Sequence, residues 1–250
     1  MFKAKDVICS QLISRLGNLS GKSVLDYGCG SGDNLKLLLD QCGENGKITA
    51  VDCNNIALDK LKQKLNQYIL SDRLIVEKCE SPETLTEKFD VCFCHNVLEC
   101  IVDKVNFINV IKNKLNCEGI FLLSHHDFDS AIYNSTDFAL TRSFIHQFSD
   151  TMQVWQKYSD GQIGRKLPGI FHQSNFDSFQ CETIRFVEYN YDEESYGFHM
   201  SKWIAECVKK DFSDEKINAW LDDLKKLSAR HEYYFAIDVN VVKPKLNEDK

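Results

Sequence analysis

Apolar residues recur along the chain in two spacings, and each spacing predicts its own kind of element. Short apolar runs bounded by turn residues predict strands, whereas apolar positions three or four residues apart predict helices. Strands are expected at 23–27, 47–51, 73–78, within 89–99, and at 119–124, 181–189 and 233–242. Helices are expected at 2–16, 33–41, 54–68, 103–116, 137–158, 196–210 and 214–229, with a loop at 164–169. This alternation predicts a doubly wound α/β fold, with a mainly parallel seven-stranded sheet, helices on both faces and an antiparallel edge strand.

A glycine-rich turn follows the first predicted strand, with glycines at Gly28, Gly30 and Gly32. Glycines at alternate positions allow a sharp turn and leave no side chain to keep a ligand from the backbone, which indicates a nucleotide pocket. A P-loop would end in Gly-Lys-Ser/Thr, but Asp33 follows the last glycine, and the G-x-x-G spacing of dinucleotide folds is absent. Carboxylates at Asp26 and Asp33 favour a ligand with an ammonium or sulfonium centre over one with phosphates.

The stretch Val24-Leu-Asp-Tyr-Gly-Cys-Gly-Ser-Gly32 resembles the first motif of class I S-adenosylmethionine-dependent methyltransferases. The segment Lys47-Ile-Thr-Ala-Val-Asp-Cys53 resembles their second anchor, a strand that ends in an acidic residue. The resemblance implies a Rossmann-like fold and S-adenosylmethionine as cofactor, with S-adenosylhomocysteine as product. It further implies that Asp26 holds the methionine amino group, that Gly28 and Gly30 lie against the cofactor, and that Asp52 binds the ribose.

Further cofactor contacts are implied at the ends of the later strands. The family places an acidic side chain on the adenine after the third strand, where this chain has Cys79 and then Glu80. The turn after the fourth strand would lie beside the methyl donor, because ligands bind beyond the carboxyl ends of such strands. The resulting additional candidates are Cys53, Cys79, Glu80, Cys94, His95 and Asn96.

The segment Ser124-His-His-Asp-Phe-Asp-Ser130 is the densest group of ionisable residues at the predicted rim of the sheet. His125 or His126 could take a proton from an attacking hydroxyl or amine, and Asp127 or Asp129 could orient that histidine or hold a cationic substrate. A capped helix start with solvated histidines would give the same pattern.

The stretch 131–180 is too long for a simple crossover and predicts a helical insertion after the fifth strand that forms the substrate wall. The acidic and aromatic segment 189–196 would suit a cationic amine, and an exposed loop explains it equally well. The substrate-binding candidates are Asp129, Tyr133, Trp155, Arg165, His172 and Tyr196.

Composition and charge narrow the choice of compartment and partner. The net charge is −7 and no basic run occurs, which disfavours nucleic acid. No apolar run approaches the roughly 20 residues that span a bilayer, and no signal peptide is evident, so a cytoplasmic protein without membrane contact is expected. The 11 cysteines are expected to be reduced thiols, and Cys92 and Cys94 to pack in the core rather than hold a metal.

We therefore expect one domain over 1–250: a lid helix at 1–20, a cofactor core at 21–130, the insertion at 131–180, and C-terminal elements at 181–243. The expected activity is methyl transfer to a nitrogen or oxygen of a small molecule, an amine being favoured, as in enzymes resembling the ubiquinone and menaquinone biosynthesis group. The alternatives are a protein or RNA methyltransferase, although the turn Cys94-His-Asn-Val97 lacks their Asn-Pro-Pro-Tyr pattern, and a non-catalytic cofactor-binding subunit. A monomer or homodimer is expected.

Overall fold

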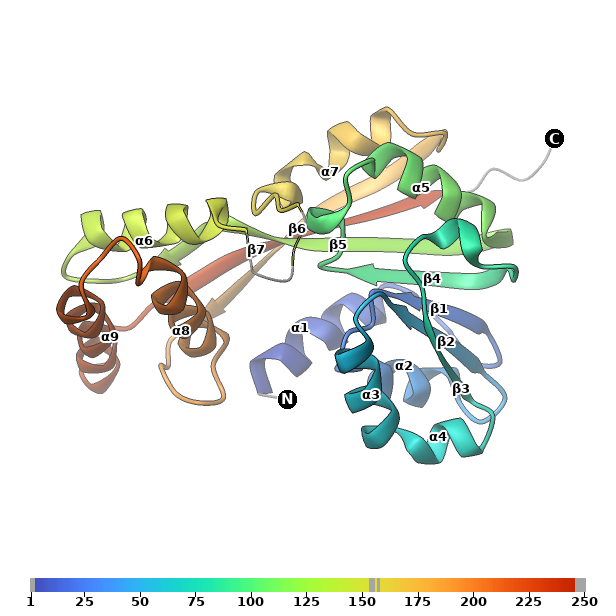
Figure 1. Cartoon of the computed structure of the whole chain (residues 1–250), viewed down its shortest axis with the longest axis horizontal. Coiled ribbons are helices and arrows are strands. Elements are labelled where there is room, and N and C mark those ends of the chain that lie inside the picture. Colours follow the sequence, from blue (N-terminus) through green and yellow to red (C-terminus); the bar gives the residue numbers. More distant parts are fainter. Residues whose placement is uncertain (1–2, 153–155, 157, 246–250) are drawn as a thin grey trace. The chain divides into compact units, whose positions relative to one another are not determined.

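The computed structural model describes residues 3–152, 156 and 158–245 (Figure 1). The chain divides into two compact units. Unit 1 comprises Met1–Ile8, His126–Lys166 and Thr183–Asn240, and unit 2 comprises Cys9–His125, Leu167–Glu182 and Val241–Lys250. The long strands β5 and β7 contribute residues to both units.

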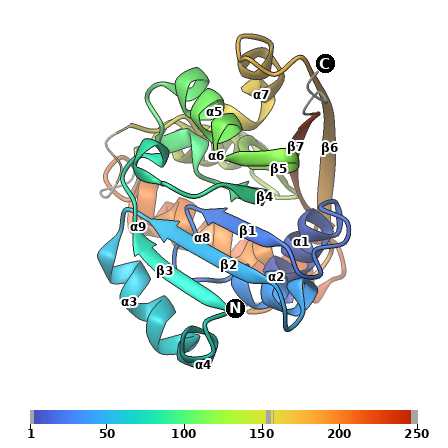
Figure 2. The same cartoon turned by 90° about the vertical axis from the view of Figure 1, so that its right-hand side faces the viewer.

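Seven strands form a single sheet in the order β3-β2-β1-β4-β5-β7-β6. Their bounds are β1 Ser23–Tyr27, β2 Lys47–Asp52, β3 Leu74–Lys78, β4 Phe89–His95, β5 Leu115–Tyr133, β6 Ser178–Glu188 and β7 Phe235–Lys245. The pairs β1–β2, β1–β4, β2–β3 and β4–β5 are parallel. Figure 2 shows β4, β1, β2 and β3 of unit 2 side by side in this order.

Strand β7 is antiparallel to both of its neighbours. The Asn134 amide donates to the Tyr234 carbonyl and the Asp238 amide to Ser130 Oγ, both at 2.9 Å, so numbering rises in β5 as it falls in β7. The Thr183 hydroxyl donates to Asn240 Oδ1 and Arg185 Nε donates to Asp238 Oδ1, both at 2.8 Å, so numbering also rises in β6 as it falls in β7. The predicted Rossmann-like sheet, mostly parallel with an antiparallel edge strand, is confirmed, but the antiparallel strand β7 lies second from the edge, between β5 and β6.

The helices alternate with the strands as predicted, with two short 3₁₀ segments in addition. Their bounds are α1 Lys3–Ser14, α2 Leu35–Cys42, α3 Asn55–Lys64, α4 Asn66–Leu70, η1 Pro82–Thr84, η2 Leu98–Cys100, α5 Lys104–Asn113, α6 Phe138–Asp150, α7 Ile163–His172, α8 Tyr196–Val208 and α9 Asp214–Ala229. Side-chain caps fix several starts, among them Asn54, which accepts from the Ile56 and Ala57 amides before α3. No described helix is both long and apolar enough to cross a membrane.

Strand β5 is longer than predicted. It runs over 19 residues to Tyr133, so the expectation that it ends at Ser124 is wrong. The polar segment from His125 to Ser130 is strand, because β5 pairs with β7 and because His125, His126 and Asp127 are buried.

Three helical regions also differ from their predictions. The expected helix at 54–68 is divided into α3 and α4, because Leu65 between them leaves the helical conformation with ψ 22°. The expected loop at 164–169 is the middle of α7, which tolerates Pro168 because Ile163, Leu167 and Phe171 form a fully buried stripe at helical spacing. Helix α6 ends at Asp150 instead of residue 158, because Thr151 leaves the helical conformation with ψ 124°.

Unit 1 has an aromatic core. The Tyr133 ring packs edge-on against Trp220 with centroids 5.6 Å apart, and Trp220 packs against Phe144 at 5.3 Å. The Trp220 indole N–H donates to Thr141 Oγ1 at 3.0 Å, so the buried polar atom is satisfied. These contacts tie α6 and α9 to β5.

Candidate functional site

The glycine turn of unit 2 is held tightly against the next strand. The Gly28 and Cys29 amides both donate to the Val51 carbonyl, at 2.8 and 3.0 Å. Gly28 has φ +78°, and a Cβ placed on it would lie 2.2 Å from Val97 Cγ2. Gly30 has φ +52° and open space where a Cβ would be. Packing against Val97 therefore requires glycine at position 28, whereas at Gly30 the backbone is open to a ligand.

Asp26 places a buried carboxyl group at the start of this turn. Its side chain is 1% exposed, and among the described residues no donor reaches its Oδ2 atom. Burial, together with the nearby Asp52 carboxylate, raises the pKa of Asp26 to about 7. An orphaned buried carboxyl group is costly, and a ligand ammonium is the group that would satisfy it.

Asp52 ends β2 and is held in place by the backbone. Its Oδ2 atom accepts from the Gly30 amide at 2.9 Å, and its Oδ1 atom accepts from the Asn54 amide at 2.8 Å. Each carboxylate oxygen can accept a second hydrogen bond, so a pair of ligand hydroxyls could still bind here. The glycine turn and this carboxylate are thus one connected structure.

The predicted adenine contacts lie at the ends of β2 and β3. Cys53 is exposed, whereas Cys79 is buried and its thiol donates to the Ser81 carbonyl at 3.1 Å. Glu80 is exposed, and its carboxylate pairs with Lys78 Nζ at 2.7 Å. Cys53 and Cys79 follow the register pair Asp52 and Lys78, so both extend the same two strand ends.

The turn after β4 is pinned to β5. His95 Nδ1 lies 2.9 Å from Ser124 Oγ, and the Asn96 amide donates to the Ser124 carbonyl at 3.0 Å. Asn96 adopts φ +57°, a left-handed conformation that asparagine tolerates better than most residues. Cys94 is buried within the strand, and burial raises the pKa of its thiol. Of the three candidates Cys94, His95 and Asn96, only His95 and Asn96 come after the buried part of β4.

A buried acid faces the candidate base His125. Glu99 lies in η2 and is 7% exposed, and its Oε2 atom lies 4.0 Å from His125 Nε2 in a fully buried side chain. Sequence reasoning missed Glu99, although a carboxylate between the apolar residues Leu98 and Ile101 was a signal of a buried acid. At this distance an ionised Glu99 would stabilise the protonated form of the imidazole.

The other rim candidates belong to unit 1. His126 stacks between Phe128 and Tyr196, with ring centroids 5.7 and 5.1 Å away. Asp127 is held by two nitrogens of Arg165, one at 2.8 Å, and Arg165 Nη1 reaches Asp129 Oδ2 at 3.0 Å. The structure therefore brings Asp127, Asp129 and Arg165 together as an ion-pair cluster.

The remaining substrate candidates are scattered. The buried Tyr133 hydroxyl donates to the Gly197 carbonyl at 2.8 Å, and Tyr196 is buried in unit 1. His172 is exposed on α7 in unit 2, edge-on to Phe179. Trp155 lies outside the described residues.

The acidic segment before α8 is used by the fold itself. Glu188 accepts from the Tyr196 and Gly197 amides, each at 2.8 Å, and Asp192 Oδ1 accepts from the Ser195 hydroxyl at 2.9 Å. Glu188 and Asp192 thus hold the backbone and the hydroxyl group at the start of α8, whereas Asp192, Glu193 and Glu194 are exposed.

Comparisons with known proteins agree with this geometry. The profile of a family described as "Methyltransferase domain" matches residues 18–203. A ubiquinone biosynthesis O-methyltransferase of Haemophilus ducreyi is 32% identical over 117 residues, which cover 44% of this chain and 48% of that protein. The chain thus matches less than half the length of this curated relative.

Solved structures share the fold over nearly the whole chain. The YcgJ protein of Bacillus subtilis has a TM-score of 0.63 at 13% identity, covering 98% of this chain and 100% of that one. A Haemonchus contortus phosphoethanolamine N-methyltransferase 2, crystallised with phosphomonomethylethanolamine and S-adenosylhomocysteine, has a TM-score of 0.56 at 14% identity. The superposition covers 96% of this chain and 52% of the Haemonchus contortus chain.

Proposed function

Because the chain belongs to the family of methyltransferase domains, we propose that it binds S-adenosylmethionine and transfers the methyl group to a small-molecule acceptor. The observation that carries the proposal is the orphaned carboxyl group of Asp26 beside a bare glycine turn. A ligand with an ammonium group and an adenosine-like diol fits both Asp26 and Asp52. The cofactor supplies an electrophilic methyl on a sulfonium centre.

Different residues of unit 2 would bind different parts of S-adenosylmethionine. Asp26 would accept from the amino group, the backbone at Gly28 and Gly30 would lie against the ligand, and Asp52 would accept from two ribose hydroxyls. Cys53, Cys79 and Glu80 would border the base, and His95 and Asn96 the methyl end. Cys94, which is buried in β4, would pack beneath the residues that border the methyl end.

His125 is the candidate base for the acceptor, with Glu99 as its positioning residue. The imidazole Nε2 atom faces the Glu99 carboxylate, so a proton taken up by His125 would be stabilised by a buried negative charge. A hydroxyl acceptor needs such a base more than an amine does, because a neutral amine attacks through its lone pair without first losing a proton. The pair therefore favours an oxygen acceptor over the amine that the sequence suggested.

The substrate-binding candidates remain predictions. Asp129, Tyr133, Arg165 and Tyr196 belong to unit 1, and His172 belongs to unit 2. Asp127, bound to Arg165, would hold that arginine in place rather than act as the orienting acid. A cytoplasmic location and a monomeric or homodimeric state remain predictions.

Two measurements test the proposal. Calorimetry should show saturable binding of S-adenosylhomocysteine that Asp26→Ala weakens strongly. Labelled S-adenosylmethionine, incubated with the protein and a metabolite extract, should then yield a labelled small product identified by mass.

Variants separate an enzyme from a binding subunit. His125→Ala should abolish labelling while S-adenosylhomocysteine binding persists, and Glu99→Gln should reduce the rate about 10- to 100-fold. Absence of binding at about 1 mM ligand, a concentration at which even weak complexes form, would disprove the proposal. Binding without any labelled product would favour a non-catalytic subunit, and label in protein or RNA would favour those acceptors.

A further inference from the structure

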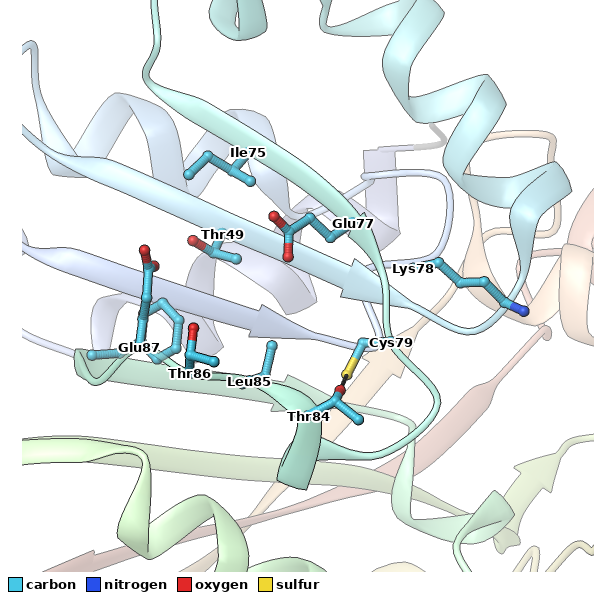
Figure 3. A pocket seen from close by; sticks show the side chains of 10 residues that line it. Thr49, Ile75, Glu77, Lys78, Cys79, Thr84, Leu85, Thr86 and Glu87 are labelled. Atoms are coloured by element: carbon cyan, nitrogen blue, oxygen red, sulfur yellow. Dashed lines mark hydrogen bonds between the residues drawn. The ribbon is translucent and has the colours of Figure 1, made fainter.

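A pocket of about 320 Å³ lies in unit 2, beside the outermost strand β3 (Figure 3). Thr49 on β2 and Ile75 and Glu77 on β3 form its floor. Thr49 and Ile75 are register partners, so these three side chains leave the same face of the sheet. The opposite wall is the segment from Thr84 to Phe89, which follows the start of η1 in the connection between β3 and β4.

The lining carries unbalanced negative charge. Glu77 and Glu87 contribute carboxylates, and neither forms an ion pair with another described residue. Lys78 is the only basic residue of the lining, and its ammonium pairs with Glu80 at 2.7 Å. Figure 3 shows the Lys78 side chain directed away from the two glutamates. The Lys114 ammonium donates to the Leu85 carbonyl of the lining, so the negative charge of the pocket is concentrated on the side of Glu77 and Glu87.

Thr49 is the second observation that indicates a ligand. It is 6% exposed, and its hydroxyl forms no hydrogen bond with any described residue. Figure 3 shows Thr49 pointing into the pocket between Glu77 and Glu87. The Thr49 hydroxyl opens onto the pocket, where water or a bound polar group would satisfy it.

The rest of the lining is apolar. Ile75, Leu85 and Phe89 supply hydrocarbon surface beside the carboxylates and the hydroxyl. We propose that this pocket binds a small organic cation, an ammonium group on a short hydrocarbon stem. The ammonium would donate to the Glu77 and Glu87 carboxylates and to Thr49 Oγ1, and the stem would cover the apolar residues.

Apart from Cys79, the lining of this pocket contains none of the residues proposed for methyl transfer. Its lining extends from Cys79 at the carboxyl end of β3 to Phe89 at the amino end of β4, whereas chemistry occurs beyond the carboxyl ends. Cys79 is the one candidate cofactor residue that it shares. The proposal does not depend on the proposed methyl transfer.

Calorimetry on the full chain tests the proposal with 1,4-diaminobutane as the probe and 1,4-butanediol as its uncharged counterpart. We expect saturable binding of the diamine, with a Kd in the millimolar range, and at least about tenfold weaker binding of the diol. The diamine affinity should fall with added salt, because the carboxylates are exposed.

Matched variants locate the bound amine. Glu77→Gln and Glu87→Gln should each weaken binding about fivefold, the size expected for one exposed ion pair, and Thr49→Val should weaken it without removing charge. Glu44→Gln, an exposed glutamate elsewhere in unit 2, should change nothing. All four variants should bind S-adenosylhomocysteine as the unmodified protein does.

Two results would overturn the proposal. One is the absence of heat with about 10 mM diamine, well above a millimolar Kd. The other is equal diamine affinity in the Glu77→Gln, Glu87→Gln and Glu44→Gln proteins, which would place the amine elsewhere. If the unmodified protein did not bind S-adenosylhomocysteine, that result would count against the proposed methyl transfer and not against the amine site.

Discussion

At the scale of single residues, the Asp26 carboxyl group should couple stability and cofactor binding to pH. Its pKa in the fold, about 7, lies above the unfolded value of 3.8. The stability that Asp26 contributes is therefore complete below about pH 4 and is lost as the pH rises through about 7. Without ligand, Asp26→Asn should be more stable than the unmodified protein at pH 8, by about 2–4 kcal/mol, and nearly equal to it at pH 4.

Urea unfolding at the two pH values measures this difference. The control is Asp59→Asn, at an exposed position of α3, which should leave the free energy of unfolding unchanged at both pH values. Cofactor affinity should rise between pH 6 and pH 8, since the ionised carboxylate is the form that pairs with an ammonium, and Asp26→Asn should remove that rise. Equal pH dependence in both proteins would contradict the assignment.

Gly28 and Gly30 should respond differently to alanine. Gly28→Ala places its methyl group 2.2 Å from Val97 Cγ2, so we expect a loss of about 2–4 kcal/mol of stability. Gly30→Ala meets nothing within 4 Å and should cost about 1 kcal/mol for its positive φ. Its methyl group would instead occupy ligand space, so S-adenosylhomocysteine affinity should fall by more than tenfold while the fold persists.

Thermal unfolding and calorimetry on the two variants test this contrast. If Gly30→Ala bound S-adenosylhomocysteine normally, the bare backbone at Gly30 would not be a ligand surface.

At the scale of elements, the ion-pair cluster fastens the start of α7 to β5. Arg165 bridges Asp127 and Asp129, and burial raises the pKa of Asp127 while Arg165 opposes that rise. Asp127→Asn and Arg165→Ala should each cost about 1–3 kcal/mol, because either change leaves a partner unsatisfied. The double variant should cost about 1 kcal/mol less than the sum, since both changes remove one interaction.

Chemical denaturation of the two single variants and the double variant gives this coupling energy. Glu206→Gln, which removes the exposed pair with Lys209, should cost less than about 0.5 kcal/mol. Additive losses at Asp127 and Arg165 would show that the two residues stabilise unit 1 independently.

At the scale of the whole molecule, the strands shared between the two units predict one cooperative unfolding transition. None of the three tryptophans lies in the sequence ranges of unit 2, which holds the proposed cofactor residues. S-adenosylhomocysteine at about 100 times its Kd should stabilise the fold by about 2.7 kcal/mol, or roughly 5–10 °C. Tryptophan fluorescence should report this shift although its signal comes from the other unit.

Far-UV circular dichroism of the same samples provides the comparison. Its midpoint should coincide with the fluorescence midpoint, both with and without the ligand. A fluorescence midpoint that stays fixed while the dichroism midpoint rises would mean that the units unfold separately.

The sequence by itself determined the order of elements and the nucleotide turn of this protein. Period-two and period-3.6 apolar patterns are local, and Gly28, Gly30, Asp26 and Asp52 lie within two neighbouring strand-and-turn segments. Such features depend on residues a few positions apart, so the sequence displays them directly. The family followed from the same residues.

Only the tertiary structure decided where β5 ends and which charges meet. The polar residues from His125 to Ser130 are equally compatible with a capped helix start, until pairing with β7, about 110 residues later in the chain, makes them strand. Likewise, Arg165 meets Asp127 across 38 positions, and Glu99 faces His125 from a different element. Long-range pairing selects among locally equivalent conformations, and no spacing in the sequence encodes that selection.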